Sequence, residues 1–176
     1  MFWTILLLVI AVAIAAVLIY AATKPDAFRI QRSLTIAAPA DKIFPHLNDY
    51  RGWQAWSPYE KKDPAMKRTF SGPATGPGAT YEWDGDKNVG KGRIEITETS
   101  PNARIAFNLS MLKPFEAHNK GEFTLEPQGN ATVVTWAMYG RTPYLAKIMH
   151  VFFNMDRMVG GDFEKGLASL KAIAEK

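Results

Sequence analysis

The sequence predicts an α+β domain behind an N-terminal transmembrane helix, and three patterns carry this prediction. Residues 2–22 contain no charged side chain. The middle of the chain holds short runs in which apolar and polar residues alternate, separated by turn-forming residues, which is typical of antiparallel strands. After Pro143, apolar residues recur every three or four positions, which indicates one long C-terminal helix.

The uncharged run is long enough, as a helix, to cross a hydrocarbon core of about 30 Å. A cleaved signal peptide is one alternative, but no Lys or Arg precedes the run, and the bulky Tyr20 stands where a small residue is wanted. A buried core helix is another, but such helices are rarely apolar on every face for about five turns. We therefore expect residues 1–22 to be a single-pass membrane anchor.

The charge distribution predicts the side of the membrane on which the domain lies. All 21 Lys and Arg follow the apolar run, and Lys24, Arg29, Arg32 and Lys42 follow it closely. The positive-inside rule then places the domain in the cytoplasm. The formal net charge of +4 is small and no Lys/Arg run exceeds two residues, so we expect no nucleic-acid partner. The absence of cysteine excludes disulfides, thiol nucleophiles and Cys-ligated zinc.

The domain is expected to start with a linker, one strand and two short helices. Residues 23–27 read as the linker, and the domain then occupies residues 28–176. Alternation predicts a first strand over residues 28–36. A helix is predicted to begin at residues 38–41, because Pro39 is suited to a first helical turn. Pro45 should shorten this helix.

A second short helix is predicted over residues 51–56. Trp53 and Trp56 lie three residues apart on it, so both rings should face the same way. The Ser57-Pro58 pair should end this helix.

The middle of the domain is predicted to be a series of strands. Each run alternates, and turn signals such as Asp84-Gly85 and Pro101-Asn102 separate them. Short successive strands of this kind indicate an antiparallel meander with one covered face. The predicted strands cover residues 67–71, 79–84, 91–99, 104–111, 117–125 and 132–138.

The C-terminal region is predicted to be one long helix with a single apolar stripe. Gly160 and Gly161 interrupt it, and a bend there would let the helix follow a curved sheet. The stripe consists of Ile148, Phe152, Met155, Val159, Phe163, Leu167 and Leu170.

Seven short segments of the sequence, taken together in their order along the chain, resemble those of a known family. They are Ile36-Ala-Ala-Pro39, Trp53-Gln-Ala-Trp56-Ser-Pro58, Phe70-Ser-Gly-Pro73, Gly76-Pro-Gly-Ala-Thr-Tyr-Glu-Trp83, Val89-Gly-Lys-Gly92, Thr132-Val-Val-Thr-Trp136 and Gly161-Asp-Phe-Glu-Lys-Gly-Leu167. Together they span nearly all of residues 28–176 and resemble bacterial polyketide cyclase/dehydrase-like members of the START/Bet v 1-like (SRPBCC) superfamily. The resemblance implies a helix-grip fold, in which an antiparallel sheet curves around the long C-terminal helix.

The same resemblance implies a cavity between sheet and helix that holds a hydrophobic small molecule or lipid. The alternative is that the large rings simply fill the core. Trp53 and Trp56 could form a lid at the mouth of such a cavity or, equally, could pack the short helices on the sheet. The candidate ligand-binding residues are Trp53, Trp56, Tyr81, Trp83, Phe107, Leu109, Phe123, Trp136, Met138, Phe152, Met155 and Phe163.

The sequence offers little support for catalysis, a cofactor or a metal. It contains no Ser/His/Asp pattern and no His cluster with metal-ligand spacing. Asp84, Asp86, Asn88 and Glu95 have part of a calcium-loop spacing, but Val89 stands where Gly is needed. A charged hairpin turn is the better interpretation.

Three functional hypotheses follow. The first is a membrane-anchored, non-catalytic binding or carrier domain for a hydrophobic molecule. The second is an enzyme acting on a polyketide-like or aromatic substrate, which needs converging polar groups such as Tyr81 and Asn119. The third is a protein-interaction module with a filled core.

Overall fold

A computed structural model describes residues 1–176 and contains seven strands and six helices. The strands are β1 (Ala27–Ile36), β2 (Lys67–Ser71), β3 (Thr80–Asp84), β4 (Lys91–Ser100), β5 (Arg104–Lys113), β6 (Ala117–Gln128) and β7 (Ala131–Arg141). The helices are α1 (Phe2–Ala22), α2 (Ala40–Asn48), the 3-10 helix η1 (Tyr50–Ala55), α3 (Pro58–Lys62), α4 (Tyr144–Phe152) and α5 (Met155–Ala174).

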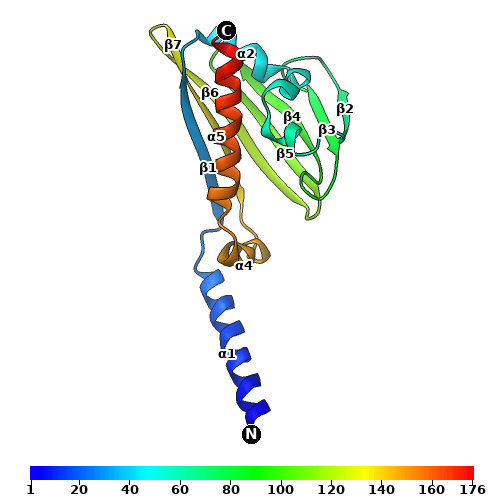
Figure 1. The fold of residues 1–176 in the computed structure, drawn as a ribbon, viewed down its shortest axis with the longest axis vertical. Coiled ribbons are helices and arrows are strands. Elements are labelled where there is room, and N and C mark those ends of the chain that lie inside the picture. Colours follow the sequence, from blue (N-terminus) through cyan, green and yellow to red (C-terminus); the bar gives the residue numbers. More distant parts are fainter.

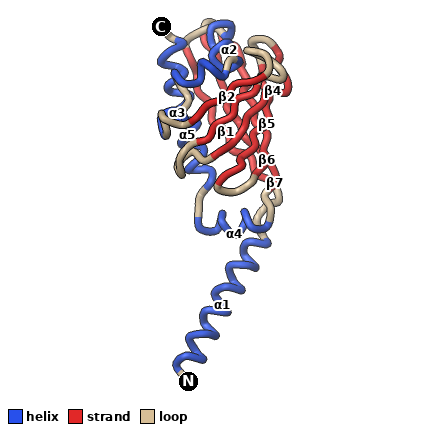
Figure 2. Tube along the Cα trace, turned by 90° about the vertical axis from the view of Figure 1, so that its right-hand side faces the viewer, coloured by secondary structure: helices blue, strands red, loops and turns tan.

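The seven strands form one antiparallel sheet in the order β1-β7-β6-β5-β4-β3-β2. The predicted α+β class, the strand at residues 67–71 and the meander are therefore confirmed. Register places Phe123 opposite Trp136 and Ile94 opposite Leu109, so alternate apolar side chains share the concave face. Figure 2 shows α2, α3 and α5 on that one face of the sheet.

Helix α5 lies against β1 and β7, at one side of the curved sheet (Figure 1). Two ion pairs attach it there, because the Arg32 guanidinium on β1 binds Asp156 at 3.0 Å and Glu164 at 2.7 Å. Gly160 makes this approach possible, because a Cβ at that position would overlap the guanidinium. The helix continues through Gly160 and Gly161 as one element.

The break in the predicted C-terminal helix falls elsewhere. The apolar stripe divides into α4 and α5 at Phe153, whose backbone is extended. Asn154 starts α5 by accepting a hydrogen bond from the Arg157 backbone N–H at 2.9 Å, a standard N-cap contact. The prediction of one helix was wrong here, because apolar spacing continues across a break that only the cap encodes. Phe152 consequently belongs to α4.

A second correction concerns Pro58, which begins α3 instead of only ending the preceding helix. Proline is well suited to a first helical turn because its missing N–H would have no helical partner there. The predicted helix over residues 51–56 is η1, and the Asp49 side chain caps it by accepting from the Arg51 backbone N–H at 2.9 Å.

Helix α1 extends away from the rest of the molecule (Figure 1), and most of its side chains are exposed. It is long and apolar enough to cross a membrane, judged by length and composition. Its contacts with the domain are made through α4. The N-terminal segment is thus an apolar rod joined to the domain at one end.

The two neighbouring glycines of α5 should respond oppositely to alanine. Gly161→Ala meets no atom within 4 Å, so it should stabilise the domain by about 0.5–1 kcal/mol through helix propensity. Gly160→Ala should destabilise it by about 1 kcal/mol, because the methyl group displaces Arg32 from its partners. Urea unfolding of the full chain in detergent measures both; equal gains would show that the Arg32 contact is unimportant.

Candidate ligand-binding site

A cluster of aromatic rings in mutual contact occupies the centre of the concave face of the sheet. The Trp136 ring on β7 stacks on Phe163 of α5, with centroids 4.1 Å apart and planes within 12°. Phe123 lies 5.1 Å from Trp136, and Trp56 lies 5.6 Å from it, centroid to centroid. Trp56 and Phe123 are completely buried. These predicted site residues therefore contact one another directly.

Trp53 and Trp56 pack the short helices onto the sheet. The Trp53 indole N–H donates to the Leu47 carbonyl at 3.2 Å, and the Trp56 indole N–H donates to the His46 carbonyl at 3.0 Å. Both rings also contact Phe123. Of the two roles considered for this pair, the geometry matches packing and does not place the rings as a lid.

The other predicted site residues on the sheet differ in solvent exposure, from buried to half-buried. Tyr81, Phe107 and Met138 are buried, whereas Trp83 and Leu109 are half-buried. The Phe107 ring lies directly over Gly121, where a Cβ would overlap it. The packing is therefore tightest around Trp136 and loosens along the strands.

A buried polar cluster lies beside the aromatic core. Glu60 on α3 is 6% exposed, and its carboxylate accepts from the Tyr81 hydroxyl at 2.6 Å and from the Arg68 Nε at 2.7 Å. Burial, with the hydrogen bond to Glu60 second, raises the pKa of Tyr81, so the hydroxyl stays protonated. The sequence reasoning missed Glu60 and Arg68. The alternation in β2 could have indicated them, because it puts Arg68 on the covered face with Phe70. An arginine that points inward needs a carboxylate partner nearby.

The pair suggested for an enzyme, Tyr81 with Asn119, is not joined by a hydrogen bond; Tyr81 binds Glu60 instead. Asn119 lies opposite Gly140 on the neighbouring strand. In the acidic loop, Asp84 pairs with Lys91 at 2.8 Å, and Asp86 accepts from the Asn88 backbone N–H at 2.7 Å. These contacts describe a charged hairpin turn.

A groove of about 540 Å³ lies at the end of the domain from which α1 leaves. It runs between the start of β1 and the junction of α4 with α5, so it is one end of the seam between sheet and C-terminal helix. Six of the eleven lining residues are hydrophobic. Two of the predicted site residues, Phe152 and Met155, belong to it. The lining residues are Lys24, Phe28, Arg29, Ile30, His150, Val151, Phe152, Phe153, Asn154, Met155 and Asp156.

Charged groups surround this apolar lining. Arg29 is paired with Glu122 at 2.9 Å and Asp156 with Arg32, whereas the Lys24 ammonium donates to the Tyr20 hydroxyl at 2.9 Å. Burial, and secondly the charge of Lys24, lowers the pKa of His150, so His150 is neutral at pH 7. Lys24 is therefore the groove cation without a carboxylate partner.

A second pocket, of about 450 Å³, lies where β7 meets α4 and is mostly polar. Within it, the Lys147 ammonium binds the Asp26 carboxylate at 2.6 Å and lowers the pKa of Asp26. This contact joins α4 to the segment that enters β1. This ion pair thus attaches α4 to the linker between α1 and β1.

Truncating the stacked rings should be costly. Trp136→Ala and Phe107→Ala should each lower the free energy of unfolding by about 3–5 kcal/mol, because their neighbours are close-packed rings that cannot collapse into the space. Urea unfolding measures this. Losses of about 1–3 kcal/mol would instead indicate a cavity already present around these rings.

The sequence model of the family "Polyketide cyclase / dehydrase and lipid transport" matches residues 27–175. No curated protein sequence matches the chain. Among solved structures, a protein of Chromobacterium violaceum is similar with a TM-score of 0.60 and 14% identity, covering 87% of this chain and 99% of that one.

Two further structures share the fold. The di-domain ARO/CYC protein StfQ of the steffimycin biosynthetic pathway gives a TM-score of 0.62 and 15% identity, with 85% of this chain and 51% of that chain covered. Ara h 8.0201 gives 0.55 and 12%, with 84% and 97% covered. With the family match over most of its length, the chain belongs to the polyketide cyclase/dehydrase and lipid transport family, within the START/Bet v 1-like (SRPBCC) superfamily.

Proposed function

We propose that the protein is a membrane-anchored binding or carrier domain for a hydrophobic small molecule or lipid. The observation that carries this proposal is the groove between β1 and the α4–α5 junction, which lies next to the anchor and combines six hydrophobic residues with five polar or charged ones. Its volume falls within the range of about 300–1,000 Å³ that is usual for small-molecule sites. The family description, which includes lipid transport, supports the same class of ligand.

The groove suits an amphiphile better than a purely apolar molecule. Phe28, Val151 and Met155 offer contacts for an apolar chain. Lys24 offers a positive charge to a polar or negatively charged head group. The ligand would then lie with its tail along the seam between β1 and α5 and its head toward the end of α1.

The close packing of rings around Trp136 supports the groove over the centre of the concave face as the ligand site. A ligand among Trp56, Trp136 and Phe163 would have to separate rings that are now in contact. A ligand in the groove needs no such rearrangement. The proposed ligand residues are therefore those of the groove, including Phe152 and Met155 of the original set.

A cross-linking experiment tests the groove. Full-length protein in liposomes is illuminated with a photoreactive fatty acid, and labelled peptides are identified by mass spectrometry. Label should appear in residues 24–30 and 150–156 and should be competed by excess oleic acid. Val151→Trp should reduce it strongly because the ring occupies the groove, while Asn130→Trp, on a distant exposed turn, should not. Label that is equal in both variants, or that is not competed, would contradict the proposal.

The anchor and its orientation form part of the proposal and have their own test. Uncleaved full-length protein should remain in membranes after carbonate extraction, because α1 can span the bilayer. Green fluorescent protein fused after Lys176 should fluoresce and alkaline phosphatase fused there should be inactive, as expected for a cytoplasmic domain. Phosphatase activity would reverse the orientation, and a soluble uncleaved chain would rule out the anchor.

A second candidate function is a cyclase-like enzyme, and the Glu60–Tyr81 pair is the observation that favours it. A protonated Tyr81 could donate a hydrogen bond to a ketone oxygen during an intramolecular aldol step. In that step an α-carbon of the substrate loses a proton to water and bonds to the ketone carbon as the carbonyl π bond breaks, and the resulting alkoxide takes up a proton. Against this, both Glu60 oxygens already have partners, as a buried structural carboxylate requires.

Matched variants separate these roles. Tyr81→Phe should reduce stability by about 1 kcal/mol through a lost hydrogen bond, and Glu60→Gln by about 3 kcal/mol because Arg68 loses its partner. Incubation with an aromatic polyketide precursor mimic, followed by mass spectrometry, should show no cyclised product for the parent. Product formed by the parent and lost in Tyr81→Phe would favour the enzyme over the carrier.

A further inference from the structure

We propose that α4 lies in the head-group region of the bilayer and, with the tip of the β5–β6 hairpin, holds the groove against the membrane. This inference rests on the anchoring by α1 proposed above and adds to it the source of the ligand. The partner of this surface is the lipid bilayer itself.

Helix α4 exposes apolar side chains and buries a charged one, which is the opposite of a helix on a water-facing surface. Leu145, Met149 and Phe152 lie on one face at spacings of four and three residues, and they are 67%, 37% and 67% exposed. Lys147, on the opposite face, is only 7% exposed and binds Asp26. A helix that covers an aqueous surface exposes its charges and buries its apolar residues. The outward face of α4 is instead suited to an interfacial lipid environment.

The contact between α4 and α1 sets the depth of this face. The Tyr144 hydroxyl donates to the backbone carbonyl of Leu18 at 2.8 Å. Leu18 lies four residues before the end of α1, or about 6 Å along the helix. Since α1 matches the hydrocarbon core in length, Tyr144 falls at the membrane–water boundary, where tyrosine side chains are enriched. Figure 1 shows α4 between α1 and the sheet, as this depth requires.

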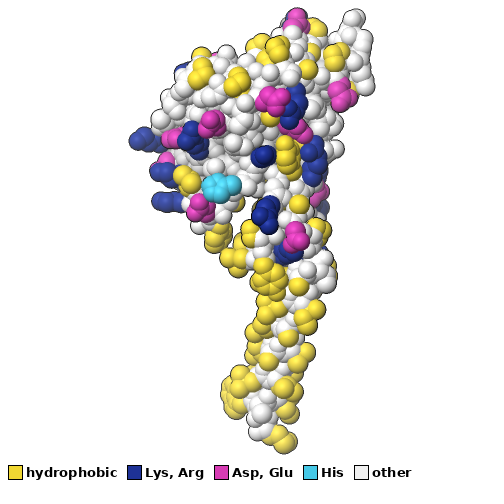
Figure 3. All heavy atoms as spheres, turned by 180° about the vertical axis from the view of Figure 1, so that it is seen from behind, with side chains coloured by type: hydrophobic (Ala, Val, Ile, Leu, Met, Phe, Trp, Pro, Cys, Tyr) yellow, Lys and Arg dark blue, Asp and Glu magenta, His cyan; other side chains and the backbone are white.

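The exposed apolar residues of the domain gather at the same end. Figure 3 shows hydrophobic side chains continuing from α1 onto the adjoining end of the domain. Soluble surfaces usually scatter such residues singly. On the C-terminal side of α1, the exposed large hydrophobic residues are Leu112, Phe115, Tyr144, Leu145, Met149, Phe152, Phe153 and Met158. Leu112 and Phe115 belong to the β5–β6 hairpin, and the others to α4, the break between α4 and α5, and the start of α5.

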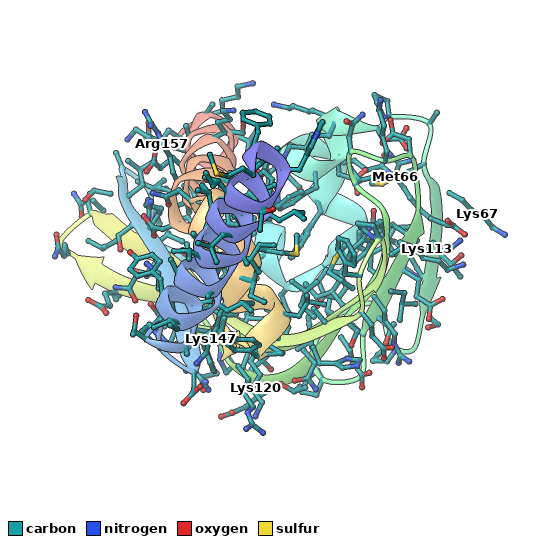
Figure 4. All side chains as sticks on the ribbon, turned by 90° about the horizontal axis from the view of Figure 1, so that it is seen from below. Met66, Lys67, Lys113, Lys120, Lys147 and Arg157 are labelled. Carbon is teal, nitrogen blue, oxygen red and sulfur yellow. The ribbon has the colours of Figure 1, made fainter.

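Positive charge accompanies these residues. Across the end of the sheet, register aligns Lys67, Asp84, Lys91 and Lys113, three cations for one anion. Figure 4, which looks from the α1 end, shows Lys67, Lys113 and Lys120 pointing outward from the sheet. Basic residues at a membrane surface are attracted to anionic lipids by about 1 kcal/mol each. Apolar and basic groups at this end therefore favour the same partner.

The position of the groove gives this surface a function. Phe152 belongs both to the outward face of α4 and to the groove lining. With α4 in the head-group region, the groove opens onto lipid, and a hydrophobic ligand would enter from the bilayer without crossing water. The cation at the groove, Lys24, would lie at the level of lipid head groups.

Depth-dependent quenching tests the proposal, and the absence of natural cysteine allows single labels. Full-length variants Leu145→Cys, Met149→Cys and Phe115→Cys carry an environment-sensitive fluorophore in liposomes containing lipids brominated near the head group. All three sites are exposed, so the label should not disturb the fold. We expect several-fold stronger quenching by bromine at these sites than at Asn130→Cys, and weaker quenching by aqueous iodide.

A label at Ile10→Cys in α1 distinguishes failure of the membrane anchoring by α1 from failure of the interfacial position of α4. If bromine placed deep in the acyl chains quenches Ile10→Cys while the α4 labels remain as accessible to iodide as Asn130→Cys, the interfacial position of α4 is wrong and the anchor stands. If Ile10→Cys is not quenched, the anchoring itself fails. A second measurement uses Leu145→Glu with Met149→Glu, which should reduce bromine quenching of the Phe115→Cys label; unchanged quenching would overturn the joint surface.

Discussion

The packing of the Trp136 ring connects every layer of the domain. The ring extends from β7, stacks on Phe163 of α5, and meets Trp56 and Tyr59 from the two short helical segments. Gly166 lies close by, where a Cβ would press on the indole. Helix α5, the short helices and the sheet therefore share one contact point, and the stacked rings bury a large apolar area there. The position of each element depends on this contact.

A filled centre has consequences for the rest of the fold. Rings occupy the middle of the concave face, and the groove lies toward the end where α1 leaves. Phe28 and Ile30 of β1 lie there beside the start of α5. The interruption between helices α4 and α5 borders a groove next to these two residues. The Arg32 ion pairs close the seam just beyond the groove. The groove is thus bounded by the same contacts that attach α5 to the sheet.

Membership of the family does not determine the activity, because one fold can carry unrelated functional sites. Two features of this chain bear on its own role: an apolar helix before the domain and an α4 helix that buries Lys147 while exposing apolar side chains. Both lie at the end that holds the groove. A carrier that loads from a bilayer needs this arrangement, whereas a soluble cyclase does not need an apolar outer face.

The sequence by itself determined the order of the strands, the strand faces and the apolar N-terminal helix, because these depend on local periodicity of two or 3.6 residues and on length. The tertiary structure decided what periodicity does not encode. The regular apolar spacing continues across the helix break at Phe153, and the break became evident only from the extended backbone there and the Asn154 cap. The contact of Tyr81 with Glu60, 21 residues away, depends on how α3 meets β3. Whether the rings enclose a void or fill it depends on side-chain packing in three dimensions, which no pattern along the chain records.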